Sequence, residues 1–195
     1  MNSIIKWAAT ASLCLASASV MAATIDVAGV KLEDTASVAN NTLQLNGAGV
    51  RYKAIFKVYT AGLYLSKKAA TTEEVLAAPG AKRMSITMLR EIDSAELGKL
   101  FSRGMEDNMD KAAFSRVVPG VMRMSQIFSD YKKLQAGDNF LVDYLPGTGT
   151  IITVKGKQQG EPFKEAEFFN SLMLIWLGKS PADYKLKDAL LGRPS

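Results

Sequence analysis

A run of ten residues from Phe56 to Leu65, FKVYTAGLYL, limits the choice of fold more than any other part of this sequence. It is rich in aromatic and β-branched residues, which favour strands. Apolar side chains occupy both sets of alternating positions near its centre, a pattern typical of a strand buried on both faces. We therefore predict a strand whose central part has protein on both sides.

Shorter segments with strand patterns flank this run. We predict strands near residues 24–30 and 43–45, and over 84–89, 139–145 and 150–154. The last two are joined by Pro146-Gly147-Thr148-Gly149. Because no helical pattern follows its Gly-x-Gly, we interpret this segment as a hairpin turn rather than a phosphate-binding loop.

The second half of the chain shows helical periodicity. Asp93 and Glu96 have the spacing of a capping box, and apolar residues then recur at intervals of three and four up to Met109. We also predict helices over residues 121–134 and 165–177, and a short helix from Ser180-Pro181 to Gly192. Strands followed by helices predict an α+β fold, with a large antiparallel sheet covered on one face by helices.

The first 22 residues have the composition of a secretory signal peptide. A basic start is followed by an apolar run from Ala8 to Val20 and by a small-residue pattern that ends at Ala22. The run is too short and too rich in serine for a membrane anchor. We expect cleavage after Ala22, a periplasmic location, no transmembrane segment in the mature chain, and one domain over residues 23–195.

Histidine is absent from the whole sequence, and the only cysteine, Cys14, lies in the predicted signal peptide. These absences exclude a Ser-His-Asp or Cys-His nucleophile, a typical structural zinc site and a His-ligated haem, so we expect no metal and no cofactor. The formal net charge is +5, and the basic residues are scattered. Such a distribution argues against nucleic acid and fits small anions or weak contact with lipid surfaces.

Two motifs resemble the chalcone isomerase-like family. The first is LNGAGVR from Leu45 to Arg51 followed by FKVYTAGLYL, and the second is the C-terminal IWLG with Ser180-Pro181 and LLG up to Gly192. The second motif is similar to the bacterial subgroup of the family. The resemblance covers nearly all of residues 23–195 and implies an open-faced β-sandwich, with a ligand cleft between the sheet and a helical layer.

The resemblance also implies roles for individual residues. Arg51 matches the arginine that holds the anionic group of the ligand, and Tyr59 falls where the family's enzymes have threonine and its fatty-acid-binding members have tyrosine. Three other positions that organise catalysis in the enzymes fall near Leu97, Gly104 and Ile175. Polar residues close to these positions could take over their roles, and they are Ser94, Ser102, Asn108 and Ser171.

Three functions follow from this comparison. The favoured one is a binding protein for a fatty acid or similar small amphipathic carboxylate, with Arg51 and Tyr59 at the head group. The residues expected along the tail are Leu97, Phe101, Met105, Phe169, Met173 and Trp176. The alternatives are an isomerase of the chalcone isomerase type, in which Arg51 is the catalytic residue, and an envelope protein with a vestigial cleft. The sequence indicates no oligomeric state.

The same residues also permit a purely structural interpretation. Arg51 could form an ion pair with Asp93, Glu91 or another carboxylate of the protein itself. Tyr59 could be a core aromatic residue whose hydroxyl bonds to the backbone. The surroundings of these two side chains decide between the interpretations.

Overall fold

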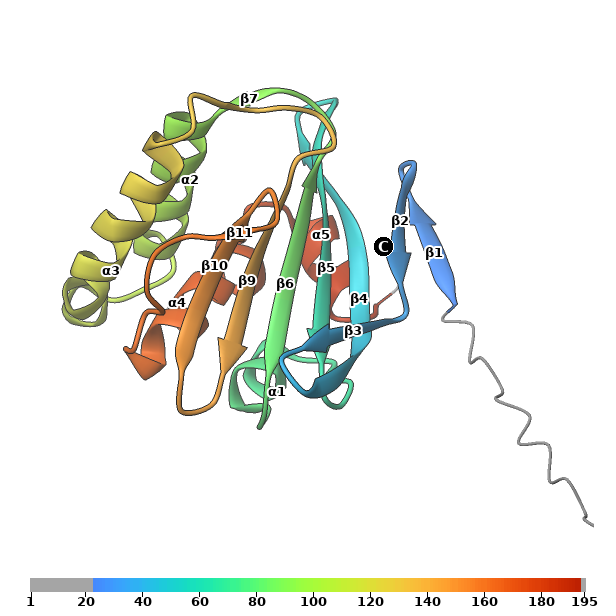
Figure 1. Ribbon diagram of the computed structural model, residues 1–195, viewed down its shortest axis with the longest axis horizontal. Coiled ribbons are helices and arrows are strands. Elements are labelled where there is room, and N and C mark those ends of the chain that lie inside the picture. Colours follow the sequence, from blue (N-terminus) through green and yellow to red (C-terminus); the bar gives the residue numbers. More distant parts are fainter. Residues whose placement is uncertain (1–22, 194–195) are drawn as a thin grey trace, which may run out of the picture.

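The computed structural model of the protein describes residues 23–193. The predicted signal peptide and its cleavage site at Ala22 lie outside the described residues, so export stays a prediction. The described chain forms a curved antiparallel sheet with helices packed against one face (Figure 1). The sequence-based expectation of an α+β fold with one helical layer is therefore confirmed.

The main sheet has seven strands in the order β11-β10-β9-β6-β5-β4-β3, with antiparallel neighbours throughout. These strands are β3 (Thr35–Val38), β4 (Asn41–Lys53), β5 (Phe56–Leu65), β6 (Lys82–Met88), β9 (Asn139–Leu145), β10 (Gly149–Val154) and β11 (Lys157–Gln158). Two smaller sheets pair β1 (Thr24–Val27) with β2 (Val30–Glu33) and β7 (Ile92–Asp93) with β8 (Lys133–Leu134).

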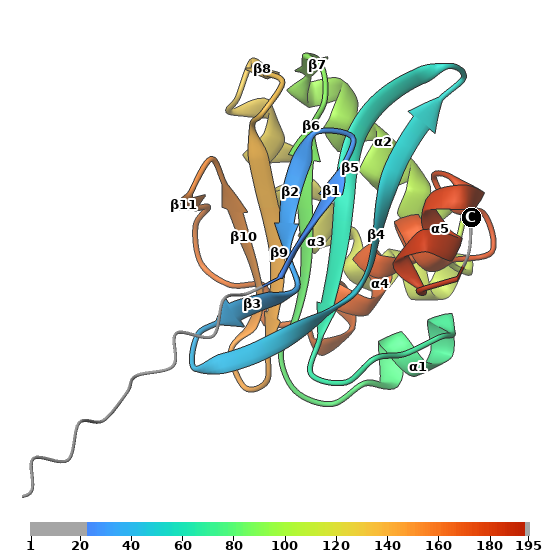
Figure 2. The same ribbon diagram turned by 90° about the vertical axis from the view of Figure 1, so that its right-hand side faces the viewer.

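Within residues 23–193, five helices follow or interrupt the strands. They are α1 (Thr72–Ala77), α2 (Ser94–Glu106), α3 (Lys111–Ser129), α4 (Ala166–Leu177) and α5 (Tyr184–Leu190). Helices α2, α3 and α4 lie behind the sheet in Figure 2, whereas the β1–β2 hairpin lies on the opposite side. None of the helices within residues 23–193 is long and apolar enough to cross a membrane.

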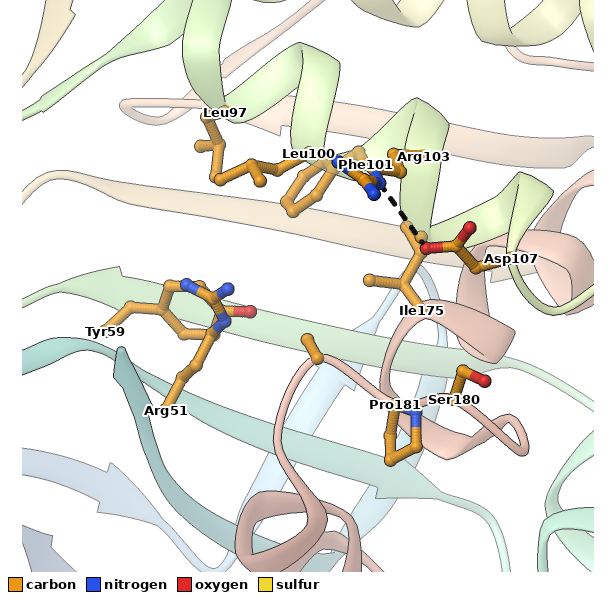
Figure 3. A pocket seen from close by; sticks show the side chains of 12 residues that line it. Arg51, Tyr59, Leu97, Leu100, Phe101, Arg103, Asp107, Ile175, Ser180 and Pro181 are labelled. Atoms are coloured by element: carbon orange, nitrogen blue, oxygen red, sulfur yellow. Dashed lines mark ion pairs between the residues drawn. The ribbon is translucent and has the colours of Figure 1, made fainter. Parts of the chain in front are cut away.

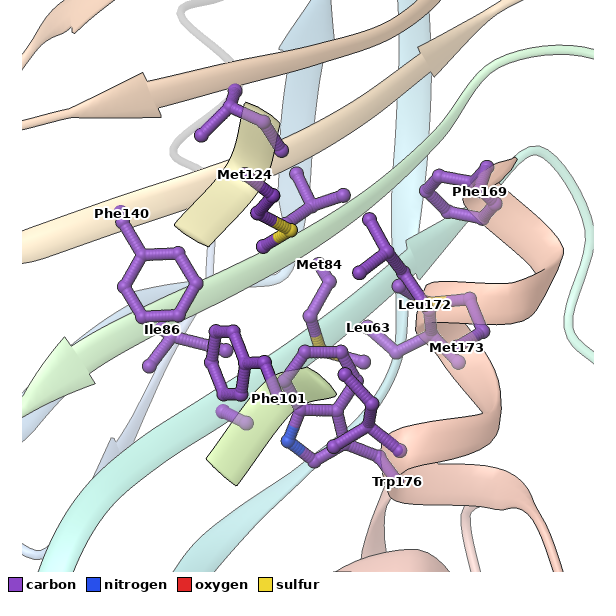
Figure 4. Packing of buried hydrophobic residues seen from close by; sticks show 14 of the residues in the cluster. Leu63, Met84, Ile86, Phe101, Met124, Phe140, Phe169, Leu172, Met173 and Trp176 are labelled. Carbon is purple, nitrogen blue, oxygen red and sulfur yellow. The ribbon is translucent and has the colours of Figure 1, made fainter. Parts of the chain in front are cut away.

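Strand β5 is buried on both faces, as its sequence predicts. Every residue from Val58 to Leu65 is buried. Leu63 and its neighbours on the helical side join the main core, in which Phe101 and Trp176 pack (Figure 4). On the other side Tyr64 packs in a smaller cluster, and its hydroxyl donates to the carbonyl of Glu33 in β2 at 3.0 Å.

The predicted bounds of two helices were wrong. Helix α3 begins at Lys111 instead of residue 121, because Asp110 caps its first turn and Pro119 is accommodated within the helix. It ends at Ser129, and Leu134 belongs to β8. Helix α5 begins after Asp183 rather than at Ser180, because the Asp183 carboxylate caps the backbone N–H groups of the first turn.

The LNGAGVR motif holds α5 against β4. The buried side chain of Asn46 donates to the carbonyls of Ala69 at 2.9 Å and Leu190 at 2.7 Å, and accepts from the Ala69 N–H at 2.7 Å. A β-bulge follows Leu45, and a Cβ on Gly47 would collide with backbone carbonyl oxygens of α5. This motif therefore fixes the position of the C-terminal helix beside the strand that carries Arg51.

Candidate functional site

A cavity of about 150 Å³ lies where β4 and β5 approach α2, the end of α4 and the segment that follows it. Figure 3 shows Arg51 and Tyr59 on one side and side chains of α2 on the other. The lining residues are Arg51, Tyr59, Leu97, Leu100, Phe101, Arg103, Gly104, Asp107, Ile175, Ser180, Pro181 and Ala182.

Arg51 and Tyr59 are brought together by the register of the sheet. They are directly opposed in the β4–β5 pair, and antiparallel residues in this relation project from the same face. The Arg51 guanidinium carbon lies 5.6 Å from the centre of the Tyr59 ring (Figure 3). A β-bulge separates Arg51 from Tyr52, so the alternation of side chains changes just beyond the site.

The Arg51 side chain forms no hydrogen bond or ion pair with any residue between 23 and 193, and its buried Nε is without a partner. The carboxylates expected as alternatives are engaged elsewhere. Asp93 caps α2 by accepting from the N–H of Glu96, and Glu91 pairs with Lys133 at 2.5 Å. A guanidinium is always charged and presents several donors in a plane. Arg51 is therefore a cation without a counter-ion from the described chain.

The Tyr59 hydroxyl is the second donor at the site. Tyr59 is fully buried, and its oxygen accepts a 2.8 Å hydrogen bond from the indole Nε1 of Trp176. Within the described chain no acceptor lies in reach of its own hydrogen. Burial raises the pKa of Tyr59 from 10.0 to about 12, although Arg51 and Trp176 act in the opposite direction. The hydroxyl consequently stays protonated, and able to donate, throughout the neutral pH range.

The opposite wall of the cavity is mainly apolar. Leu97, Phe101 and Ile175 face Arg51 and Tyr59, and Gly104 leaves room for Ile175, because a Cβ there would lie 3.2 Å from its side chain. Exposed Arg103 and Asp107 form a 3.7 Å ion pair at the rim (Figure 3). The site thus combines two inward donors with a hydrocarbon wall and an open, charged edge.

Comparison with known proteins identifies the family of this chain. The chalcone isomerase-like family model matches residues 23–192. The chain belongs to this family. A search of curated protein sequences finds no significant match.

A solved structure shows the same fold. The crystal structure of a fatty-acid binding protein of Arabidopsis thaliana superposes with a TM-score of 0.68 at 15% sequence identity, and the match covers 84% of this chain and 92% of that chain. The sheet of seven strands with one helical layer is therefore the chalcone isomerase-like fold that the motifs predict.

The three positions matched to the catalytic residues of the family do meet at the cavity. They are occupied by Leu97, Gly104 and Ile175, whose side chains cannot form hydrogen bonds. None of the polar residues expected as substitutes lines the cavity. Ser94 is buried without a hydrogen-bond partner, and the hydroxyls of Ser102 and Ser171 donate to backbone carbonyls of their own helices.

Asn108 has a structural role instead. Its amide donates to the carbonyls of Gly104 and Ser180, each at 2.8 Å, and its oxygen accepts from the N–H of Ser180 at 2.7 Å. A side chain at Gly178 would collide with this amide. Asn108 therefore holds in place the segment after α4 that forms one wall of the cavity.

The residues predicted along the ligand tail divide into two groups. Leu97 and Phe101 line the cavity. The other four are fully buried in the main core and do not line it; they are Met105, Phe169, Met173 and Trp176. Their apolar spacing on α2 and α4 directs them toward the sheet, so their contact with a ligand tail stays a prediction that this cavity does not support. Trp176 still contributes indirectly through its hydrogen bond to Tyr59.

Several wall residues were missed at the sequence level. Leu100, Arg103 and Asp107 continue from Leu97 at intervals of three, three and four to the end of α2, which could have identified this helical face. No sequence signal indicates the wall from Ser180 to Ala182, because its position depends on long-range hydrogen bonds to Asn108. Within residues 23–193 no group of three or more acidic, His or Cys side chains is placed to hold a metal ion.

Proposed function

We propose that the protein binds a fatty acid or similar small amphipathic carboxylate, whose carboxylate group contacts Arg51 and Tyr59. The observation that carries this proposal is the Arg51 guanidinium, which borders an apolar cavity and has no counter-ion in the described chain. The buried Nε lacks a hydrogen-bond acceptor, and a carboxylate matches the planar donor set of arginine. The protonated Tyr59 hydroxyl supplies a further hydrogen bond to the same group.

The neighbouring wall is suited to the hydrocarbon part of such a ligand. Leu97, Phe101 and Ile175 remove alkyl carbons from water, which is favourable by roughly 25 cal/mol per Å². The solved structure that shares the fold is described as a fatty-acid binding protein, which supports the same ligand class. The low identity makes this support general rather than specific to any residue.

An isomerase is less well supported. Leu97, Gly104 and Ile175 cannot organise water at the positions that the family's enzymes use for this purpose. We therefore favour binding over ring closure.

The cavity volume predicts that affinity stops rising at a short chain length. We expect octanoate and hexadecanoate to bind with similar affinity, because a longer chain must leave the cavity past the rim of Arg103 and Asp107, where its added carbons stay in water and contribute nothing. Isothermal titration calorimetry with acids of even chain length measures this. If affinity instead rises steadily up to the longest chain, the tail is buried in space that this cavity does not provide.

We also infer that this binding takes place in the periplasm. The support is the sequence of residues 1–22, which has the basic start, apolar stretch and small-residue ending of an exported precursor. The intact mass of the protein recovered from the periplasm tests the inference. A chain that begins at Ala23 is expected, and a retained N-terminus would contradict it.

A further inference from the structure

The turn between β4 and β5 exposes an unusual group of apolar side chains. Ile55 is 84% exposed, Phe56 55% and Tyr52 40%. The other large exposed apolar residues lie singly on β1, α3 and α5, and they are Ile25, Met122 and Tyr184. Isolated residues of this kind are normal on a protein surface, whereas a cluster indicates a surface that something covers.

The turn itself departs from ordinary hairpin chemistry. Two-residue hairpin turns favour asparagine, aspartate or glycine where φ is positive. This turn has Ala54 at φ 54°, similar to Ala28 and Ala39 in two other turns. Gly29 and Asn40 follow those alanines, whereas here the next residue is the large apolar Ile55. All residues from Tyr52 to Lys57 are exposed, and the hairpin extends away from the body of the molecule (Figure 2). The sequence thus places apolar residues at a tip where folding alone favours small polar ones.

Both faces of this hairpin tip have the same composition. Tyr52 is paired with Lys57 and Lys53 with Phe56, so each face carries one aromatic and one lysine side chain, with Ile55 at the apex. Aromatic and lysine side chains are characteristic of the boundary between lipid and water, where the ring lies among the head groups and the ammonium reaches water. The tip therefore has an apolar apex at Ile55, followed by two cross-strand pairs that each combine one ring with one ammonium group.

Two cations at the tip are available to a partner. Among the described residues Lys57 and Arg90 form no ion pair, and the Arg90 guanidinium carbon lies 5.0 Å from the centre of the Phe56 ring. Two nearby carboxylates are already neutralised, Glu96 by Lys53 at 3.4 Å and Glu91 by Lys133 at 2.5 Å. A third, Asp93, caps α2. Asp183 accepts from the N–H of Tyr52 at 2.8 Å, at the base of the hairpin. Lys57 on the hairpin itself and Arg90 against the Phe56 ring are the cations that a partner at the apex would meet.

We propose that the β4–β5 tip docks on an anionic lipid bilayer, with Ile55 and Phe56 entering the head-group region and Lys57 and Arg90 contacting lipid phosphates. A second copy of the chain would place the same cations against each other, whereas an anionic membrane supplies the opposite charge. Arg51 lies four residues from Ile55, a distance of roughly 13 Å along a strand. Docking in this way would bring the cavity close to the membrane surface.

Vesicle co-sedimentation tests this surface separately from the ligand site. Protein beginning at Ala23 is mixed with vesicles of phosphatidylcholine alone, or of phosphatidylcholine and phosphatidylglycerol in equal parts. We expect binding to the anionic vesicles, weakened by added salt because the lipid charge is screened. Ile55→Asp should weaken it about tenfold or more, the factor that burial of one isoleucine contributes. Lys57→Gln should weaken it about fivefold, the contribution of one cation near the surface.

Matched substitutions away from the tip serve as controls. Met122→Asp changes a residue on α3 that is 67% exposed, and Lys157→Gln changes an exposed lysine on the far strand β11. Neither should alter vesicle binding. Equal losses in the controls, unchanged binding of Ile55→Asp, or no binding of the wild type would overturn the proposal.

Two further measurements distinguish membrane docking from dimerisation through the tip and from ligand binding in the cavity. Analytical ultracentrifugation of the wild type should show a monomer. A dimer that Ile55→Asp dissociates would instead identify a second copy as the partner and overturn the proposal. Octanoate affinity of Ile55→Asp in the absence of vesicles should equal that of the wild type. Failure of the docking proposal would therefore leave the carboxylate site to be tested separately. Failure of the carboxylate site would likewise leave the docking proposal to be tested.

Discussion

Replacing Arg51 with alanine is expected to reduce octanoate affinity several hundredfold. A carboxylate that enters the cavity loses its hydration, and the Arg51 guanidinium is the cation placed to compensate for that loss. Removing one member of such a pair typically costs roughly 3–5 kcal/mol. Isothermal titration calorimetry at constant pH and salt measures the difference directly.

Three comparisons make the Arg51 result specific. Tyr59→Phe should cost about 1 kcal/mol, the usual contribution of one hydrogen bond. Arg103→Ala, which removes an exposed cation at the rim of the same cavity, should cost about 0–1 kcal/mol. Since Arg51 has no partner in the described chain, the ligand-free Arg51→Ala protein should be as stable as the wild type to within about 1 kcal/mol, the contribution of a cation–π contact. A clear fall in its Tm with unchanged affinity would identify Arg51 as a structural residue.

Replacing Gly47 with alanine is expected to destabilise the fold by about 3 kcal/mol, a decrease in Tm of roughly 10 °C. The added methyl group would collide with carbonyl oxygens of Ala189 and Leu190, which cannot move without displacing α5. That displacement would also break the buried hydrogen bond from Asn46 to Leu190. Thermal and urea unfolding followed by circular dichroism measure the effect.

Gly98→Ala is the matched control for Gly47→Ala. Gly98 lies within α2, and a Cβ there would meet its nearest neighbour at 3.5 Å, an ordinary contact distance. Because alanine favours helices over glycine by about 1 kcal/mol, this variant should be as stable as the wild type or more so. If both variants unfold at the wild-type temperature, α5 is not held against β4 in the way described.

The sequence predicts most of the fold because its strands and helices carry local signals. Burial of β5 on both faces, the cap at Asp93 and the end of α4 before Gly178 all follow from nearby residues. The failures occur where a local signal competes with the tertiary structure. Pro119 suggests a helix start, yet α3 continues through it because the first turn is capped well before the predicted start, at Asp110.

The candidate site was only partly predictable. Arg51 and Tyr59 are opposed across a hairpin, so the motif that contains them also places them together. The hydrocarbon wall was harder to predict because every apolar residue of α2 and α4 was a candidate, and only the crossing of these helices determines which ones line the cavity. Met105 and Met173 lie in the core for this reason, while Ile175 lies at the site.

The pKa of a bound carboxylate tests the central claim most directly, because it reports the charge that faces the ligand. Octanoate labelled with ¹³C at its carboxyl carbon can be titrated by NMR, free and bound to the wild-type protein. Arg51 and the Tyr59 hydroxyl should hold the pKa of the bound acid below that of the free acid by about 1–3 pH units, since both stabilise the ionised form. A bound carboxyl group that titrates at or above the pKa of free octanoic acid would contradict the account, because burial would then dominate and Arg51 would not be its counter-ion.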